Sequence, residues 1–430
     1  MKIKGNQFFK ICLMFVFVNG SAFAQADPFS PKQTLQYKEY LARISDNNLE
    51  YAAERYNLDI ADAEMQAARV FPDPELSFGW GDNGHKRMQM GYAFEAELTW
   101  DLELGGKRKA RKEVALSERR LAEFELTDFF QKLRSESTIA YLEAMQNKML
   151  FDIQKDSYES MKQIAKSDSI RYSLGQISKV ESIQSRLESK SMWNELVDAE
   201  VEWNNSLLEM KGFFSNTKDD TSYLPEGDFQ KFDRLFDLED LIITAQNNRA
   251  DFLVAKQNQI VASSQVRLAR AERVVDLGLS LGVENNSFVK NAVAPTPGNT
   301  TVSVGVSVPL KFSNRRDSGL RTALIEQRQV DLEYRDIELG LEREITQSYR
   351  NYVNKQKQIQ LYENGMLEEA KEVLDGMKYS YQRGASSLLE VLEAQRTYNE
   401  TQQAYAEALF DYASALVELE HAVGIWDIDF

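Results

Sequence analysis

The chain has 430 residues and a formal net charge of −16 at pH 7, and 27% of its residues are charged. This acidic balance lacks the basic face that nucleic-acid binding requires, so we expect no nucleic-acid partner. Cys12 is the only cysteine, which excludes an internal disulfide framework.

The first 24 residues predict a secretory signal peptide. Three lysines within the first ten residues precede the apolar run Ile11–Val18, and Ala22-Phe23-Ala24 follows as a small-residue cleavage pattern. The apolar run is too short to cross a bilayer as a helix. A buried N-terminal helix is the alternative. If residues 1–24 are a signal peptide, Cys12 leaves with them, and we predict no N-terminal lipid anchor.

Two very long stretches, 107–171 and 315–383, predict helices of unusual length. All eight prolines lie outside them, and proline breaks a helix interior. Apolar residues recur at helical spacing in both stretches. At the rise of an α-helix, 65 residues extend about 100 Å, which suits a coiled or tubular assembly better than a compact globule. Shorter helical patterns cover 34–70, 179–214, 238–273 and 387–423.

The periodicity changes from helical to alternating at two places, which predicts one β-hairpin at about 75–104 and another at about 276–312. The apolar positions predicted to face lipid are Leu98, Trp100, Leu102, Val304, Val306 and Val308. The polar positions of the first hairpin include four carboxylates, Glu95, Glu97, Asp101 and Glu103. Strands of this length and alternation are typical of a membrane barrel. A soluble sheet gives the same pattern, but the long solvated helices leave nothing apolar to cover it.

Four strands are too few to close a barrel, because the smallest single-chain barrels have about eight. Open strand edges are prohibitive in lipid. The chain must therefore oligomerise, and the strand count alone permits two or three copies.

The two halves of the chain repeat one another. The segment Leu104-Gly105-Gly106-Lys107-Arg108 corresponds to residues 312–316, 208 positions later. The segment Tyr172-Ser173-Leu174-Gly175 corresponds to residues 381–384, 209 positions later. A nearly constant offset indicates internal duplication. The predicted units are a first repeat at 25–214, a connecting segment at 215–237 and a second repeat at 238–430.

Motifs at the strand ends and at the second helix turn resemble a known family. The strand-to-helix junctions cover 102–112 and 309–323, and Tyr381-Gln382-Arg383-Gly384 leads into the run Leu388-Leu389-Glu390-Val391-Leu392-Glu393-Ala394-Gln395. Together these motifs resemble the TolC family of outer-membrane efflux proteins. Residues 247–251 are similar to the family's Asn-Arg-Pro-Asp motif, with Ala250 in place of the proline. The resemblance extends over about residues 35–425.

The resemblance implies a mainly α-helical fold with a membrane β-barrel contribution. Long antiparallel coiled-coil helices would form an α-barrel in the periplasm, with residues 215–237 in an equatorial belt. Four strands per chain would close a twelve-stranded barrel in outer-membrane lipid only as a homotrimer. The implied function is that of an exit duct, which passes substrates from an inner-membrane pump and a periplasmic adaptor to the exterior.

The helix turns near 173–177 and 383–386 would then be the periplasmic tips of the duct. The resemblance implies that the tunnel closes there, and that an adaptor contacts Leu174, Gly175, Gln176, Arg383 and Gly384. The first tip is only similar to the Val-Gly-Leu type of many family members, which leaves the identity of the adaptor open. Glycine is also expected at any helix C-cap, so simple turn chemistry is the alternative explanation.

The sequence contains none of the motifs expected of an enzyme. His85 and His421 form no pair at metal-ligand spacing, and there is no nucleophile elbow, P-loop or dinucleotide fingerprint. We therefore predict a non-enzyme without a cofactor or metal site. The four carboxylates are predicted to face the lumen and to favour cations, unless they pair with Lys311, Lys107 or Arg108.

Three other functions remain open. They are a type I secretion exit duct, a periplasmic adaptor and a structural coiled-coil protein. An adaptor needs a Gly-rich β domain that the chain lacks, and the two hairpins contradict unbroken heptads. The compact length is similar to that of the heavy-metal (CzcC-like) branch of the family, which makes metal cations the first substrate hypothesis and drugs the second.

Overall fold

The structure is a computed structural model that describes residues 33–214, 221–229, 234–310 and 315–428. The signal peptide predicted at 1–24, part of the predicted connecting segment and Lys311 lie outside the described residues. No helix among the described residues is long and apolar enough to cross a membrane.

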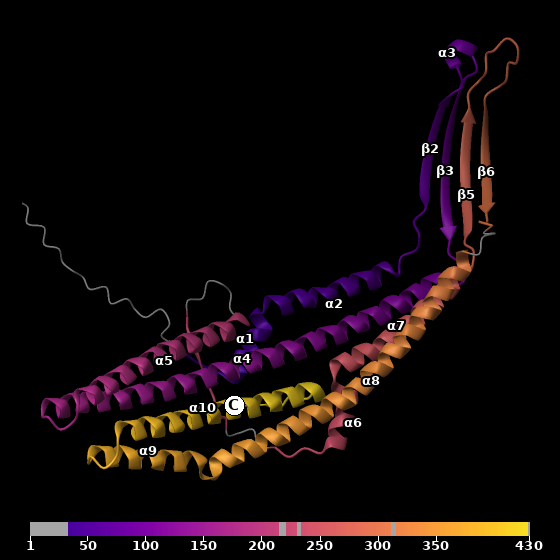
Figure 1. The fold of residues 1–430 in the computed structure, drawn as a ribbon. Helices are drawn as coiled ribbons and strands as arrows, with labels where there is room; N and C mark the ends of the chain where they lie inside the picture. Colours follow the sequence, from indigo (N-terminus) through magenta and orange to yellow (C-terminus); the bar gives the residue numbers. More distant parts are fainter. Residues whose placement is uncertain (1–32, 215–220, 230–233, 311–314, 429–430) are drawn as a thin grey trace, which may run out of the picture.

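Helices dominate the described chain (Figure 1). They are α1 (Tyr37–Asn47), α2 (Leu49–Ala67), α3 (His85–Met88), α4 (Lys107–Ser173), α5 (Lys179–Gly212), α6 (Leu238–Asn248), α7 (Ala250–Glu272), α8 (Arg315–Leu361), the π-helical turn η2 (Tyr362–Met366), α9 (Leu367–Gln382) and α10 (Leu388–Val423). The strands are β1 (Gln33–Gln36), β2 (Glu75–Asp82), β3 (Tyr92–Leu102), β4 (Tyr223–Glu226), β5 (Leu277–Asn286) and β6 (Asn299–Ser307).

The helices form one long layer, and a four-stranded sheet projects from one end of it (Figure 1). Near the sheet the layer runs in the order α2, α4, α7, α8, each helix packing on the next. In the far half α5, α4, α10 and α9 follow one another in the same way. Helix α4 has 67 residues and extends about 100 Å, so it belongs to both halves. The length predicted for 107–171 is therefore confirmed.

Three predicted helices are interrupted, at Asn48, at Arg249 and at η2. The stretch 34–70 begins with β1 and then divides at Asn48, whose side chain accepts a hydrogen bond from Tyr51 N at 2.8 Å and so caps a new helix. The stretch 238–273 divides at Arg249, which has an extended backbone. The stretch 315–383 is broken at η2, where Gly365 takes a φ of 119° that only glycine adopts readily.

The sheet has the order β2-β3-β5-β6, and every pairing in it is antiparallel. The two predicted hairpins therefore lie side by side, joined by the β3–β5 ladder in which Trp100 pairs with Leu279. The strands end earlier than predicted, β3 at Leu102 and β6 at Ser307. The outer strands β2 and β6 each have one edge that pairs with no other described strand.

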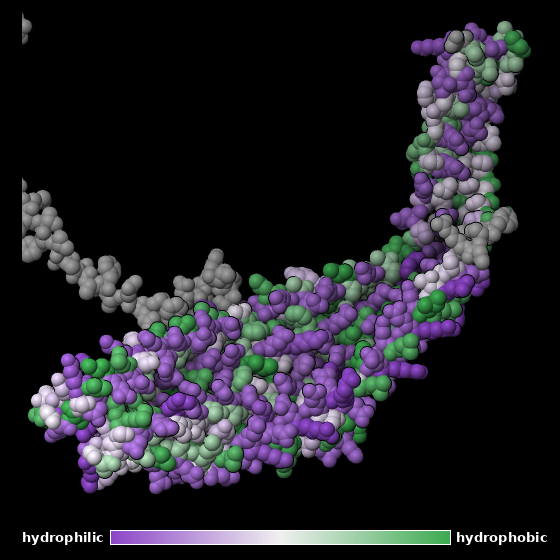
Figure 2. All heavy atoms as spheres, in the orientation of Figure 1, coloured by the Kyte–Doolittle hydropathy of each residue, from purple (hydrophilic) through white to green (hydrophobic). Residues whose placement is uncertain are grey.

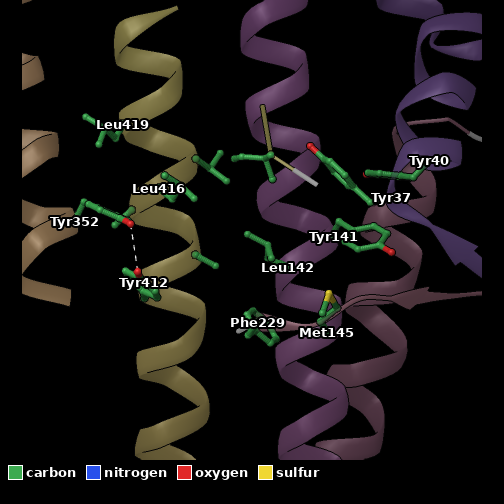
Figure 3. Packing of buried hydrophobic residues seen from close by; sticks show 14 of the residues in the cluster. Tyr37, Tyr40, Tyr141, Leu142, Met145, Phe229, Tyr352, Tyr412, Leu416 and Leu419 are labelled. Atoms are coloured by element: carbon green, nitrogen blue, oxygen red, sulfur yellow. Dashed lines mark hydrogen bonds between the residues drawn. The ribbon is translucent and has the colours of Figure 1, made fainter. Parts of the chain in front are cut away.

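The main core lies at mid-height of the helical layer, around the middle of α4, and it also includes buried residues of α1, α8 and α10. Figure 3 shows part of this core. The Tyr141 hydroxyl lies 2.8 and 2.7 Å from the carbonyl oxygens of Leu35 and Glu226, either of which can accept its proton, and it accepts a hydrogen bond from Glu226 N at 2.9 Å. These contacts tie α4 to the β1–β4 pair. Tyr352 and Tyr412 share a hydrogen bond of 3.2 Å between α8 and α10. These three tyrosine hydroxyls thus each have a partner, as burial of a polar group requires.

Candidate functional site

The sheet has one apolar face and one polar face, and the register shows which residues share each. Leu98 pairs with Leu76 and Leu281, and Leu281 pairs with Val304, so these side chains form one apolar row across four strands. Most of the large apolar side chains of this face are strongly exposed: Phe78 68%, Trp80 71%, Val302 65%, Val304 80%, Val306 64%, Leu98 41% and Trp100 41%. No described element covers them. Monomeric soluble proteins rarely expose so large a continuous apolar surface.

The predicted lipid-facing residues belong to this face, with two differences in detail. Leu102 is the last residue of β3, lies opposite Leu277 and is partly buried. Val308 follows the end of β6 and is 47% exposed. Trp100 donates its indole N–H to the carbonyl of Pro72 at 2.9 Å, which fixes the ring near the end of the sheet that meets the helices.

The opposite face carries small polar residues and carboxylates. Glu95, Glu97 and Asp101 lie on it in β3, facing glycine or small polar neighbours such as Gly79 and Gly278. Glu284 of β5 pairs directly with Glu95. The sequence reasoning did not select Glu284, although the alternation of 277–284 places it in the polar phase; its proximity to Glu95 follows only from the β3–β5 register.

Glu103 has a different position from the other three predicted carboxylates. It follows the end of β3, and its two oxygens accept hydrogen bonds from the Arg111 guanidinium at 2.5 and 3.0 Å. Nearby, Lys107 is buried and pairs with Asp276 at 2.5 Å. Among the described ion pairs, none includes Glu95, Glu97 or Asp101.

The strand-to-helix junction depends on a glycine. Gly105 has a φ of 75°, and a Cβ there would stand 2.5 Å from the Cβ of Val274. A side chain is therefore excluded both by the backbone conformation and by the contact. Gly106 has the same φ, but a Cβ there would have open space.

The two far turns of the helical layer are built alike. At the first, Leu174 follows α4, Gly175 has a φ of 72°, and Gln176 N donates to the carbonyl of Arg171 at 2.9 Å. Ser178 then caps α5 in a reciprocal pair of hydrogen bonds with Glu181.

At the second turn, Arg383 and Gly384 occupy the equivalent positions, and Gly384 has a φ of 75°. Ala385 N donates to the carbonyl of Ser380 at 2.9 Å, and Ser387 forms the capping box with Glu390. Leu174 is 67% exposed at the first turn. The predicted tip residues thus lie at exposed turns that protrude from the end of the layer (Figure 1).

A buried carboxylate links the two helical hairpins close to these turns. The side chain of Asp168 on α4 is fully buried, and Tyr381 on α9 donates its hydroxyl to Asp168 Oδ1 at 2.9 Å. Burial raises the pKa of the Tyr381 phenol above its ordinary value, so the group keeps its proton. The Arg171 guanidinium lies over the Tyr381 ring at 4.9 Å.

This contact forms one wall of a cavity of about 620 Å³ between α4 and α9. Lys378 also crosses it, donating to Ser160 Oγ at 2.7 Å. Sequence reasoning named the turns rather than Asp168, because an acidic residue within a polar helix gives no signal that distinguishes a buried position from a solvated one.

The described residues include no group of three or more histidines, cysteines and carboxylates that could hold a metal ion. His85 is exposed and is the first residue of α3, which lies between β2 and β3. His421 lies near the end of α10, and burial, followed by the charge of Arg249, lowers the pKa of its imidazole. The helices that carry these histidines, α3 and α10, lie far apart in the fold (Figure 1).

Comparisons with known proteins agree on the kind of molecule this is. The family described as outer membrane efflux protein matches residues 41–212 and 241–425. The chain is 22% identical to the cobalt-zinc-cadmium resistance protein CzcC of Cupriavidus metallidurans over 395 residues, which cover 91% of this chain and 90% of that protein. It is 23% identical to the outer membrane protein TolC of Vibrio cholerae over 195 residues, 43% of each.

Solved structures share the fold. The CmeC outer membrane channel of Campylobacter jejuni superposes with a TM-score of 0.74 at 17% identity, over 90% of this chain and 86% of that one. CusC, whose structures are described in terms of folding and transmembrane channel formation, superposes with a TM-score of 0.74 at 18% identity. The superposition covers 92% of this chain and 95% of CusC.

Proposed function

The chain belongs to the outer membrane efflux protein family, and we propose that it is the exit duct of a tripartite efflux system. It is a protein of the cell outer membrane that extends into the periplasm. In the proposed system an inner-membrane pump and a periplasmic adaptor deliver substrates to the far turns of the helical layer. The duct carries them through the outer membrane without a catalytic step.

The observation that carries this proposal is the exposed apolar face of the sheet. Val304, Phe78 and Trp80 are 80%, 68% and 71% exposed and lie on one continuous surface. At about 25 cal/mol per Å² of apolar area, exposure of such a surface to water is strongly unfavourable, whereas lipid solvates it. The polar face would then line the lumen.

The open edges of β2 and β6 support a barrel shared between copies. Unpaired backbone groups cost several kcal/mol each in hydrocarbon, so the two edges need strands from neighbouring chains. Family resemblance favours three copies and twelve strands. The order α2-hairpin-α4-α5 in one half and α7-hairpin-α8-α9-α10 in the other supports internal duplication, with repeats at 25–214 and 238–430 joined by 215–237.

The far turns are the proposed site of closure and of adaptor contact. Leu174 and Gly384 lie at the exposed ends of the two helical hairpins. The Asp168–Tyr381 hydrogen bond joins these hairpins just above the turns, so it favours a closed end. We infer that opening requires this bond to break.

The substrate class proposed first is metal cations. The similarity to the cobalt-zinc-cadmium resistance protein over 91% of the chain supports it. The carboxylates Glu95, Glu97, Asp101 and Glu284 on the polar face of the sheet also favour cations over anions, because copies of the chain would repeat them around the pore.

Reconstitution in planar lipid bilayers tests the proposed function. The purified protein is expected to give discrete conductance steps and, in a salt gradient, a reversal potential of the sign that indicates cation preference. A folded, membrane-inserted protein without conductance would refute the duct. A conducting but anion-selective protein would refute only the role of the carboxylates.

A further inference from the structure

The start of helix α4 is strongly basic, although the chain as a whole has a net charge of −16. Five of its first six residues are basic: Lys107, Arg108, Lys109, Arg111 and Lys112. The first turn of the helix contains no acidic residue. The helix dipole makes positive charge unfavourable at this end of a helix. The stability of α4 therefore does not explain the basic run.

Two members of the basic run are neutralised within the chain, and three are not. Lys107 pairs with Asp276, and Arg111 pairs with Glu103. Among the described residues, the other three members form no ion pair: Arg108, Lys109 and Lys112. Both lysines of this set are exposed. The run thus leaves positive charge available on the surface.

The connector between α2 and β2, residues 68–74, lies against the start of α4. Arg108 donates its Nε–H to a backbone carbonyl of this connector at 2.7 Å, and its guanidinium lies over the Phe71 ring, 3.8 Å from the ring centre. Trp100, on the apolar face of the sheet, donates its indole N–H to the carbonyl of Pro72 in the same connector. These contacts place the basic run at the end of the apolar face that meets the helices (Figure 1).

Basic and apolar side chains are exposed together at this junction. Val70 and Phe71 are 57% and 56% exposed, and Arg69 is exposed next to them. Leu116 is 43% exposed one turn beyond Lys112 on α4. In Figure 2, hydrophilic and hydrophobic residues lie side by side where the sheet joins the helical layer. Four basic residues that form no ion pair among the described residues are called the junction cluster: Arg69, Arg108, Lys109 and Lys112.

The acidic residues near the junction cluster are fewer, and most of them face other groups. Glu113 pairs with an arginine of α7, and the charge of Glu272 acts on Arg111. Glu75 belongs to the polar face of the sheet by its register in β2. Asp73 is exposed in the connector. The four positive charges of the junction cluster therefore outnumber Asp73, the one acidic residue of the connector.

Resting on the proposed function, we propose that the junction cluster binds the phosphate groups of anionic phospholipids in the periplasmic leaflet of the outer membrane. The proposed function places the apolar face of the sheet in hydrocarbon. The end of this face that meets the helices then lies at the level of the lipid headgroups. Tryptophan side chains are enriched at this level of a membrane, and Trp100 occupies it.

The chemistry of the junction cluster matches that of a phosphodiester. Guanidinium and ammonium groups form short, charge-assisted hydrogen bonds to phosphate oxygens. The aliphatic stems of arginine and lysine lie along apolar surface while their charges reach the headgroups, as the Arg108 side chain does over Phe71. Basic residues directly outside a hydrophobic span attract anionic lipids, by about fivefold in affinity for each residue. Lipid bound at the cluster would hold the sheet at a fixed depth in the membrane.

Native mass spectrometry of the purified full chain in neutral detergent tests the proposal. Dioleoyl-phosphatidylglycerol should bind about tenfold more tightly or better than dioleoyl-phosphatidylcholine, which has the same acyl chains and a zwitterionic headgroup. Raising the ionic strength should reduce this preference. Millimolar inorganic phosphate should not displace the lipid, because it lacks the acyl chains that lie on the apolar face.

The variant Lys109→Gln with Lys112→Gln removes two charges from an exposed surface of α4. Its preference for phosphatidylglycerol should fall about tenfold or more. The matched control is Lys155→Gln with Lys166→Gln, which changes two exposed lysines of the same helix about 70 Å or further from the junction. The control has the same net charge as the test variant and should bind both lipids as the wild type does.

The outcomes separate this proposal from the proposed function. A loss of preference in the 109/112 variant alone supports the junction cluster. A wild-type chain that conducts but binds the two lipids equally overturns the cluster and leaves the duct intact. Equal preference in the two variants, whether lost or retained, overturns it too, as does a 109/112 variant that no longer assembles, since its lysines then contact another copy of the chain. A wild-type chain that neither enters membranes nor conducts overturns both proposals.

Discussion

Glu420 on α10 provides a direct test of the packing at mid-height. Its carboxyl group is fully buried. Arg234 Nη1 lies 2.9 Å from Oε1, and the backbone N–H of Asp427 donates to Oε2 at 3.1 Å. Burial raises the pKa of Glu420 from 4.5 to about 7, although Arg234 and Arg134 both lower it. Desolvation therefore outweighs the ion pair.

The sign of the effect on stability follows from that direction. A carboxyl group whose pKa is raised by folding stabilises the fold fully below its unfolded pKa of 4.5, and this contribution is lost as the pH rises through about 7. The shift corresponds to about 3 kcal/mol. Glu420→Gln cannot ionise, so its free energy of unfolding should lack this part of the pH dependence.

Urea unfolding in detergent, followed by far-UV circular dichroism between pH 4.5 and about 8, measures the difference. The stability of the wild type relative to Glu420→Gln should fall by about 3 kcal/mol across this range. Glu418→Gln is the matched control, because Glu418 is exposed two residues earlier on the same helix. Parallel pH profiles for the wild type and Glu420→Gln would show that burial does not control this carboxyl group.

Three further outcomes are expected. Tyr381→Phe removes a hydrogen bond to a buried carboxylate, which is worth about 1.5–3 kcal/mol. Single-channel recordings should therefore show an open probability that is about tenfold higher or more. An unchanged open probability would show that this bond does not hold the far end of the duct closed. The double variant Glu95→Gln with Glu284→Gln should lower the cation-to-anion permeability ratio about twofold or more. The reversal potential in a salt gradient measures this ratio, and an unchanged ratio would place the two carboxylates away from the ion path. Gly105→Ala should destabilise the fold by about 2–4 kcal/mol, because the new side chain meets both an unfavourable backbone conformation and Val274. Gly106→Ala meets only the unfavourable backbone conformation and should cost about 1–2 kcal/mol. Thermal unfolding measures the difference, and equal melting temperatures for the two variants would contradict the contact with Val274.

Local sequence patterns determined the length of α4 and the existence of the hairpins. Helical and strand periodicity depend on residues a few positions apart, and the absence of proline from 107–171 left the helix uninterrupted. The helix turns were also readable, because the positive φ of Gly175 and Gly384 is a local requirement.

Strand and helix ends were less well predicted, because a periodic pattern does not show where a capping group intervenes. Asn48 begins a new helix inside an apparently continuous pattern. Glu103 continues the alternation of β3 in the sequence, but the strand has already ended and Arg111 binds its carboxylate.

Only the tertiary structure decided which distant residues meet. Glu95 lies opposite Glu284 because β3 pairs with β5, a choice that alternation within either strand does not specify. Tyr381 meets Asp168 across 213 positions because two helical hairpins pack at one height. Such contacts depend on the arrangement of whole elements, whereas the sequence by itself determined the elements and their apolar and polar faces.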